Sequence, residues 1–446
     1  MVQSDLIIIG GGPGGYEIAA EVAAKGLSVT LIERDALGGT CLNRGCIPTK
    51  CLCASASAIL TVADAARFGV EVSGYKADYS AAAARMAQVT GQLRDGIASL
   101  LSKVNVVHGE ARLAPDHVVE VGAEQYTAPR IIIATGSAPA ALNIPGAELA
   151  MTSDDFLRLT ELPRRVAIIG GGVIGMEFAS ILAAFGTEVT VLEFMKEILP
   201  PFDPEVAKRL RMSLQKRGVV TKVGAAVTAI EKSGEELRVA YSGKKGEEAV
   251  ECDAVIMAVG RKAVVPDGCD AAGIKLTQKG FIAVDDNYQT SAREIFAVGD
   301  VNGRCMLAHA AAAQARVVMG LMDGRSMLVP SAVFTAPECA MAGLTPAQCD
   351  AEGLRYKSAK AMFAANGKAL AMGEGEGFVK VLYDARSGRI YGVHIIGPHA
   401  ADLVAEATAV MDSGMSVNEV AHQIVHGHPT LSEVFAAACT AAVLED

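Results

Sequence analysis

The chain has 446 residues, a formal net charge of −10, 51% hydrophobic residues, only 5% aromatic residues and no Trp. This length exceeds what a single hydrophobic core organises, so we expect about two to four domains. The apolar residues are mostly aliphatic, which suits helices packed on a buried parallel sheet, and the negative charge argues against a nucleic-acid-binding surface.

The chain gives no sign of export or of a membrane span. Residues 1–4 carry no positive charge, and the apolar run Leu6 to Ile9 is too short for a signal peptide. The longest apolar stretch, Val166 to Gly186, contains Glu177 and several glycines, and its first half has the pattern of a buried strand. We therefore expect a cytoplasmic protein without membrane contacts, in which most of the ten cysteines are free thiols.

The first predicted unit is a dinucleotide-binding motif. An apolar strand runs into a glycine-rich turn, an alanine-rich helix follows, and a second strand ends at Glu33. In such a turn Gly10 permits the tight bend, Gly12 lets the backbone approach a pyrophosphate, and Gly15 brings helix and strand together. The helix N-terminus offers N–H groups to phosphates, and the acid accepts hydrogen bonds from a ribose.

Two cysteines follow directly, in the segment Gly38 to Lys50. In a regular helix, Cys41 and Cys46 would lie about 8.7 Å apart at Cα, whereas a disulfide rarely spans more than about 7 Å. The pair can close only if the segment is irregular, which Gly45 and Pro48 favour. A zinc site is the competing interpretation, but it needs four ligands and no histidine lies nearby.

The strand, glycine turn, helix and acid recur further along the chain, with Gly170, Gly172, Gly175 and Glu193 at the same spacing. Two nucleotide sites and a thiol pair predict a relay from a dithiol to a tightly held carrier and then to a diffusible one. Flavin accepts electrons from a thiolate and nicotinamide does not. We therefore expect FAD in the first copy and NAD in the second, where Glu193 would repel the 2′-phosphate of NADP.

Three further apolar strands end in glycine and bring backbone towards a cofactor. Thr135 and Gly136 follow the first strand, Gly260 ends the second, and Asp300 follows the third. We expect Asp300 to bind a flavin ribitol hydroxyl, with a plain turn aspartate as the alternative.

Beyond Pro330 the glycine motifs stop, and strand-like runs flank the turn at Ser387-Gly388, which predicts a unit with an antiparallel sheet and helices. Near its end, His428 precedes a proline and Glu433 lies at a predicted helix start. Dithiol chemistry needs a base because the thiolate is the nucleophile, and a carboxylate orients an imidazole for that task. His428 with Glu433 is one candidate base, and His426 is its rival.

These residues resemble the flavin-dependent pyridine-nucleotide disulfide oxidoreductases over nearly the whole chain, most closely the members that oxidise dihydrolipoyl groups with NAD. The resemblance is carried by both glycine motifs, Gly38 to Lys50, Gly299-Asp300, Met306 to His309, Ala364 to Gly367, Gly392 to Asp402 and His428 to Glu433.

The resemblance implies a role for each matched residue. Cys41 and Cys46 form a redox-active disulfide, in which Cys41 exchanges with substrate and Cys46 contacts the flavin. Lys50 lies near flavin N5 with Glu177 as its partner, and Ala308 belongs to the cofactor-binding set. His428 acts as the base, oriented by Glu433, on the thiols of the other subunit. The implied partners are a second copy in a homodimer with shared active sites and a lipoyl-carrying protein, either a 2-oxoacid dehydrogenase acyltransferase or a glycine-cleavage carrier.

The expected fold class is α/β, with two Rossmann-like dinucleotide-binding domains and a C-terminal α+β dimerisation domain. We expect the FAD-binding domain at residues 1–145 and 269–329, the NAD-binding domain at 146–268 and the interface domain at 330–446, with FAD and NAD as cofactors and no metal.

Two other functions remain as alternatives. A sister reductase acting on glutathione disulfide or mercuric ion with NADPH predicts cations after the second strand, or a vicinal cysteine pair near the C-terminus. A flavoprotein interaction module predicts loss of a relay residue, and none is lost. Arg44, between the thiols, departs from the small apolar residue that is usual there, and it bears on substrate fit or thiolate stability.

Overall fold

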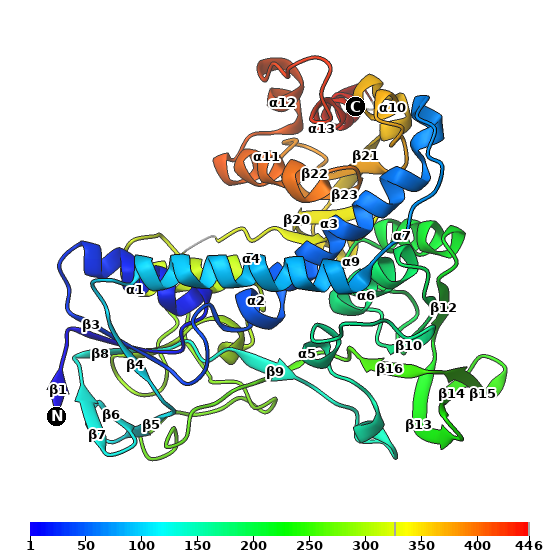
Figure 1. The fold of residues 1–446 in the computed structure, drawn as a ribbon. Helices are drawn as coiled ribbons and strands as arrows, with labels where there is room; N and C mark the ends of the chain where they lie inside the picture. The colour runs from blue at the N-terminus through cyan, green and yellow to red at the C-terminus, as the bar shows by residue number, and fades with distance from the viewer. Residues whose placement is uncertain (325–326, 445–446) are drawn as a thin grey trace.

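The structure is a computed structural model, and it describes residues 1–324 and 327–444. Positions 325–326 of the expected central segment and 445–446 of the expected interface domain lie outside the described residues. Figure 1 shows two groups of parallel strands at the bottom of the view and a third, C-terminal unit above them. The fold class is α/β, as predicted.

The first unit is built on a five-stranded parallel sheet in the order β18-β8-β2-β3-β4. Its strands are β2 (Leu6–Ile9), β3 (Val29–Glu33), β4 (Asn105–His108), β8 (Arg130–Ile133) and β18 (Ile295–Ala297). β2 is buried at every position, which explains its uninterrupted apolar sequence. Because β18 pairs with β8, the chain returns to this sheet after passing through the second unit.

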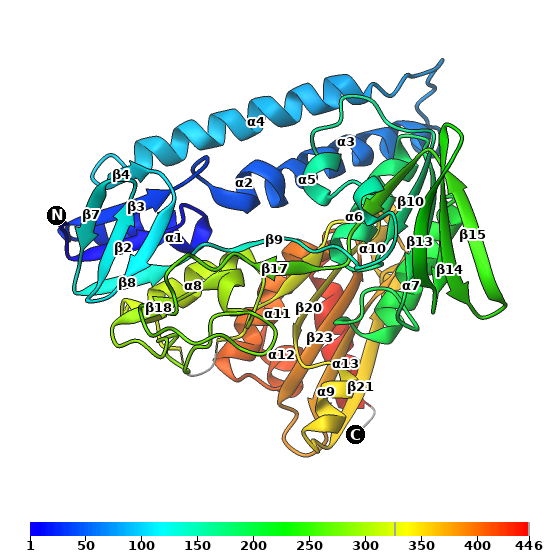
Figure 2. The ribbon, with the colours of Figure 1, turned by 90° about the horizontal axis from the view of Figure 1, so that it is seen from below.

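Helices and a small sheet complete the first unit. Its helices are α1 (Pro13–Ala24), α2 (Gly39–Arg44), α3 (Cys46–Ala63), η1 (Ala65–Phe68), α4 (Tyr79–Leu100), η3 (Gly299–Asn302) and α8 (Ala308–Val318). The second sheet has the order β1-β7-β6-β5, formed by β1 (Val2–Gln3), β5 (Ala111–Ala114), β6 (Val118–Val121) and β7 (Glu124–Thr127). Figure 2 shows α4 as a long helix running beside α2 and α3.

The second unit repeats the architecture of the first. Its parallel sheet, in the order β12-β11-β10-β16, contains β10 (Arg165–Ile169), β11 (Glu188–Glu193), β12 (Val220–Val223) and β16 (Ala254–Met257). Around it lie η2 (Ala147–Leu149), α5 (Ser153–Phe156), α6 (Val173–Ala184), α7 (Pro204–Lys216) and the antiparallel strands β13 (Ala226–Ser233), β14 (Glu236–Gly243) and β15 (Gly246–Cys252). β9 (Ser137–Pro139) pairs with β17 (Arg261–Ala263) and joins the two units.

The third unit is an antiparallel sheet in the order β19-β20-β23-β22-β21, packed with helices. Its strands are β19 (Ser331–Val333), β20 (Glu338–Gly343), β21 (Tyr356–Met362), β22 (Phe378–Asp384) and β23 (Ile390–Gly397). Its helices are α9 (Pro346–Ala351), η4 (Phe363–Ala365), α10 (Gly367–Ala371), α11 (Ala400–Ser413), α12 (Val417–Gln423) and α13 (Glu433–Leu444). The predicted strands around Ser387-Gly388 are confirmed as the hairpin β22–β23.

All three units share one hydrophobic core, to which α3 of the first unit contributes Leu52. Leu210 and Leu214 of α7 belong to the same buried cluster as Phe378 of β22 and Ile396 of β23. Among the described residues, one helical stretch, Gly39–Ala63, is long and apolar enough to cross a membrane by length and composition alone. That stretch is interrupted at Gly45 and carries both thiols of the predicted redox pair.

Candidate active site

The thiol pair lies at a break between two helices. α2 ends at Arg44 and α3 begins at Cys46, with Gly45 between them at φ −150° and ψ −113°. A Cβ on Gly45 would lie 2.9 Å from the carbonyl oxygen of Thr40, so the break leaves no room for a side chain there. The predicted departure from a regular helix is confirmed. The two thiols lie close enough for each to shift the pKa of the other.

The two thiols differ in acidity. The hydrogen bond from Cys41 lowers the pKa of the Cys46 thiol to about 7, against the effect of burial and with help from the charge of Lys50. The same hydrogen bond, together with burial, raises the pKa of Cys41. The direction of the two shifts favours Cys46 as the thiolate of the reduced pair and Cys41 as its protonated neighbour.

Lys50 and Glu177 form an ion pair next to the thiols. The Lys50 Nζ atom lies 3.0 Å and 3.1 Å from the two carboxylate oxygens of Glu177, which is almost fully buried on α6. The backbone N–H of Phe334 donates to the same carboxylate at 2.9 Å, and the Phe334 ring lies 4.4 Å from Nζ. All three units of the fold thus contribute to holding this ammonium group in place.

Asn43 and Arg94 stabilise the thiol segment by hydrogen bonds, and the sequence did not predict this role for either residue. The Asn43 side chain donates to the carbonyl groups of Leu37 (3.0 Å) and Gly39 (2.9 Å), and its oxygen accepts two hydrogen bonds from Arg94 of α4. Asn43 was inside the segment singled out from the sequence, but Arg94 gave no local signal. Arg44 pairs with Asp35 at 2.5 Å and with Asp154 at 3.8 Å.

The first glycine turn is closely packed, and no side chain caps the N-terminus of the helix that follows it. A Cβ on Gly15 would lie 1.9 Å from the carbonyl oxygen of Gly10, so helix and strand approach as the motif requires. Gly12 is the N-cap residue of α1 and has no side chain to cap the helix, and a Cβ on Gly39 would lie 2.7 Å from the Gly12 Cα. The Glu33 carboxylate accepts from the Gly11 N–H at 2.7 Å and keeps lone pairs for a ribose.

The other predicted FAD residues gather at the ends of β8 and β18. Asp300 accepts a hydrogen bond from Ser137 at 2.5 Å, and Ser137 in turn accepts one from Arg261 at 2.7 Å. The Thr135 hydroxyl donates to the Val264 carbonyl at 2.5 Å, and Gly136 has a φ of +71°. Ala308 begins α8, which also has no side-chain cap. Ser137 and Arg261 were not predicted from the sequence.

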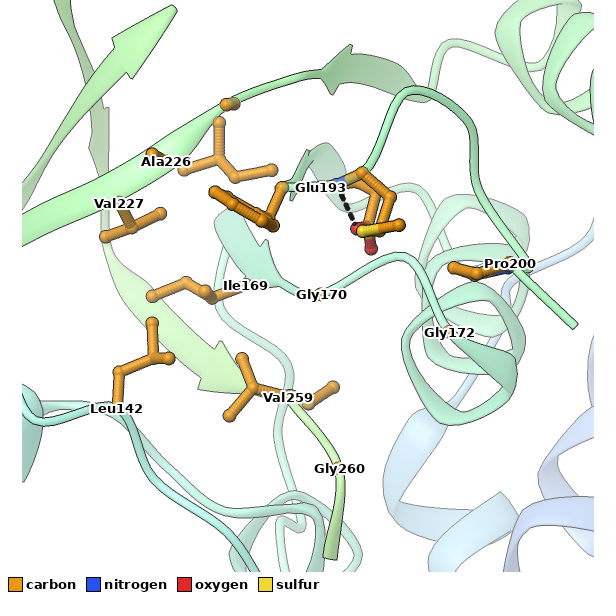
Figure 3. A pocket seen from close by; sticks show the side chains of 15 residues that line it. Leu142, Ile169, Gly170, Gly172, Glu193, Pro200, Ala226, Val227, Val259 and Gly260 are labelled. Carbon is orange, nitrogen blue, oxygen red and sulfur yellow. Dashed lines mark hydrogen bonds between the residues drawn. The ribbon is translucent and has the colours of Figure 1, made fainter.

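The second glycine turn opens into a cavity of about 480 Å³. Gly170, Gly172, Glu193 and Gly260 line it, and Figure 3 shows these residues around one hollow. Glu193 accepts from the Gly171 N–H at 2.5 Å, as Glu33 does in the first copy. A Cβ on Gly175 would lie 2.0 Å from the Gly170 carbonyl oxygen, so helix and strand pack as closely in the second copy as in the first.

Both turns fit a dinucleotide. Each begins a helix of twelve residues at a glycine without a side-chain cap, so backbone N–H groups remain for a pyrophosphate. Each also places a buried carboxylate beside the turn. Glu193 accepts hydrogen bonds from the Gly171 and Met195 N–H groups and has no cationic partner within the described part of the chain. Its uncompensated negative charge favours a free ribose hydroxyl over a phosphate.

His428 and His426 lie in opposite environments. The His428 side chain is 80% exposed, and its Nδ1 atom lies 2.9 Å from Glu433, whose pKa is lowered by the Thr430 N–H and by His428 itself. His426 is 8% exposed and pairs with Glu406. The Nε2 atom of His428 is therefore the one that faces outward, and no described hydrogen bond connects it to the thiols of its own chain.

No group of three or more His, Cys, Asp or Glu residues that suits a metal ion occurs within residues 1–324 and 327–444. All ten cysteines are free thiols, including Cys41 and Cys46.

Comparison with known families gives two matches that together span almost the whole chain. Residues 4–315 match the family model described as pyridine nucleotide-disulphide oxidoreductase. Residues 329–439 match the model described as the dimerisation domain of the same family.

Relatives and solved structures agree with these matches. The chain is 39% identical to a dihydrolipoyl dehydrogenase from Thermus scotoductus, over 97% of this chain and 96% of the relative. It is 37% identical to a dihydrolipoyl dehydrogenase from Chlamydia muridarum, over 98% and 97%. The solved structures include LpdA from Mycobacterium tuberculosis (TM-score 0.89, 27% identity) and the HOCl-induced flavoprotein disulfide reductase RclA from Escherichia coli in its Cu(II) complex (TM-score 0.87, 28% identity), each covering 99% of both chains.

Proposed function

The chain belongs to the pyridine nucleotide-disulphide oxidoreductases, and on that premise we propose that it oxidises protein-bound dihydrolipoyl groups to lipoyl groups with NAD as the final acceptor. It is an FAD-dependent enzyme with NAD as its second coenzyme, and its dimerisation domain supports a homodimer. The observation that carries the proposal is the Cys41–Cys46 pair, held at a helix break between the first glycine turn and the Lys50–Glu177 ion pair.

The first half of the proposed cycle is thiol–disulfide exchange. A dihydrolipoyl thiolate attacks the Cys41 sulfur of the oxidised pair, the Cys41–Cys46 bond breaks, and Cys46 leaves as a thiolate. The second dihydrolipoyl sulfur then displaces Cys41 and closes the lipoyl disulfide. His428 of the partner subunit accepts the substrate proton, with Glu433 holding its ring through Nδ1.

The second half removes two electrons from the reduced pair. FAD held at the first glycine turn would supply a two-electron acceptor beside Cys46, and NAD held at the second glycine turn would supply the final acceptor. The pKa of about 7 favours the thiolate at Cys46, which is the form that can donate electrons. Lys50 holds a positive charge beside that position, and Glu177 keeps the ammonium group from turning away.

The proposed protein partner is a lipoyl-carrying protein, either an acyltransferase of a 2-oxoacid dehydrogenase complex or a glycine-cleavage carrier. The cytoplasm is the proposed compartment, because all ten cysteines are free thiols, which a reducing compartment maintains.

The decisive experiment compares two substrate pairs in steady state. We expect rapid NADH formation from dihydrolipoamide and NAD, and little oxidation of NADPH by glutathione disulfide, because Glu193 disfavours a 2′-phosphate. A preference for glutathione disulfide with NADPH would contradict the proposal and favour a sister reductase.

A further inference from the structure

One helix of the second unit is fastened to the sheet of the third by a buried ion pair. Asp203 caps α7, accepting hydrogen bonds from the N–H groups of Glu205 (2.8 Å) and Val206 (3.4 Å). Its other oxygen accepts from Lys380 Nζ, on β22, at 2.8 Å. The Asp203 side chain is 0% exposed and that of Lys380 is 7% exposed, so the pair is removed from water.

Such a pair acts mainly on geometry. A buried ammonium group must keep its carboxylates, because an unpaired buried charge is strongly destabilising. Lys380 Nζ also lies 2.7 Å from a Glu205 oxygen, so two carboxylates of the α7 N-terminus converge on one cation. This arrangement specifies one position of α7 on β22.

A second attachment lies further along the same helix. Glu376, just before β22, accepts a hydrogen bond from Ser213 at 3.1 Å and pairs with Arg209 at 3.2 Å. α7 is therefore held to the third unit at its first turn and again along its length, and rotation about either attachment is prevented.

The same helix positions a wall of the coenzyme cavity. Phe194, Met195 and Pro200 line the cavity, and they belong to the connection between β11 and α7. This connection is tied to α7 by Arg211, whose guanidinium donates to both oxygens of Glu197 at 2.7 Å and 2.8 Å. Figure 3 shows Pro200 and Gly172 on the same side of the hollow.

We propose that Lys380 is a positioning residue for the nicotinamide coenzyme: its ion pair with Asp203 fixes α7, and α7 fixes the 194–202 connection that walls the coenzyme cavity. Lys380 touches neither the thiols nor the glycine turns. The inference rests on the proposed function only in requiring that the second unit binds NAD.

The test separates the two half-reactions of the holoenzyme by anaerobic stopped-flow absorbance. In Lys380→Met, we expect the NADH dissociation constant for reduction of the bound FAD to rise about tenfold. Reduction of the same FAD by dihydrolipoamide should stay within about twofold of wild type, because the described side-chain hydrogen bonds of Asp203 and Lys380 go to each other, Glu205 and Val206 and none goes to the thiol segment. A general loss of structure would slow both reactions together.

Two further variants complete the design. Asp203→Asn keeps the helix cap and removes the charge, so it should reproduce the tenfold effect even if Lys380→Met fails to fold. Lys360→Met removes an exposed pair with Glu205 and should leave NADH binding unchanged. Unchanged NADH binding in Asp203→Asn, or equal slowing by both reductants, would overturn the inference. If dihydrolipoamide fails to reduce the wild-type enzyme, the proposed function is contradicted. The NADH measurement would still test the positioning role of Lys380.

Discussion

At the scale of single residues, two histidines separated by one glycine offer a matched comparison. His428 is exposed and oriented by Glu433, whereas His426 is buried against Glu406. We predict that His428→Gln lowers kcat with dihydrolipoamide and NAD by about 10²–10⁴-fold, the range for loss of a general base. His426→Gln should cost thermal stability but change kcat by less than about tenfold. Equal losses of kcat in the two variants would remove His428 from its proposed role.

The ionisation of Cys46 gives a second residue-scale prediction. Its pKa of about 7 depends first on the hydrogen bond from Cys41 and then on the charge of Lys50. In Lys50→Met, the pH at which the reduced enzyme becomes reactive to iodoacetamide should therefore move upward. The control is Lys25→Met, which removes an exposed ion pair with Glu21 and is not among the charges that shift the pKa of Cys46. An identical pH profile in Lys50→Met and wild type would show that Lys50 does not act on the thiolate.

His394 should make the protein sensitive to acid. Burial lowers its pKa to about 4, although Asp203 opposes the shift, and its ring is fully enclosed. The unfolded chain takes up the proton near the ordinary pKa of 6.5 and the folded chain does not, so stability falls as the pH drops from about 6.5 to about 4. Between pH 7 and pH 5 this amounts to about 2 kcal/mol. Thermal unfolding should show a smaller loss over that range in His394→Gln than in wild type, and an equal loss would contradict the assignment.

At the scale of elements, the two glycine turns predict separable cofactor losses. A Cβ at Gly15 or at Gly175 would collide with the carbonyl oxygen five residues earlier. Gly15→Ala should yield protein that does not retain FAD, measured by the flavin absorbance of the purified enzyme. Gly175→Ala should retain FAD but bind NADH at least about tenfold more weakly. Loss of FAD from Gly175→Ala alone would reverse the assignment of the two turns.

Local patterns predicted the strands and helices of the two glycine motifs and some elements of the third unit, but few of the contacts between elements. The break at Gly45 followed from the spacing of Cys41 and Cys46, and the strand at β2 followed from its apolar run. The hydrogen bond from Arg94 to Asn43 could not be predicted, because these residues lie on different helices and nothing in the sequence indicates which way an arginine side chain points. The ion pair of Lys380 with Asp203 was missed for the same reason.

At the scale of the whole molecule, the exposed His428 predicts an active site made from two chains. If the base acts on the partner's thiols, mixing Cys46→Ser and His428→Gln subunits creates one intact site in each hybrid dimer. We therefore predict that co-refolded or co-expressed hybrids recover up to about half of the wild-type kcat, since symmetric dimers contain two equivalent sites. Hybrids as inactive as their parents would place the base and thiols in the same chain.

The repeat predicted two similar units, and the change of pattern near Pro330 predicted a third. How these units pack could not be read from the sequence, because the shared core joins α7 to β22 and β23 across long stretches of chain. Apolar periodicity shows that a face is buried but not which partner buries it. The attachment of α7, which adjoins the coenzyme cavity, to the C-terminal sheet could therefore be seen only in the structure.

The central claim is that electrons enter through Cys41 and leave on NAD, and a single-turnover experiment tests it most directly. Anaerobic holoenzyme is mixed with dihydrolipoamide, flavin absorbance is followed, and NAD is then added. We expect flavin absorbance to fall in wild type and NAD to restore it with formation of NADH, whereas Cys41→Ser should show a flavin reduction rate lower by on the order of 10³-fold or more. Flavin reduction at the wild-type rate in Cys41→Ser would show that electrons do not enter through Cys41.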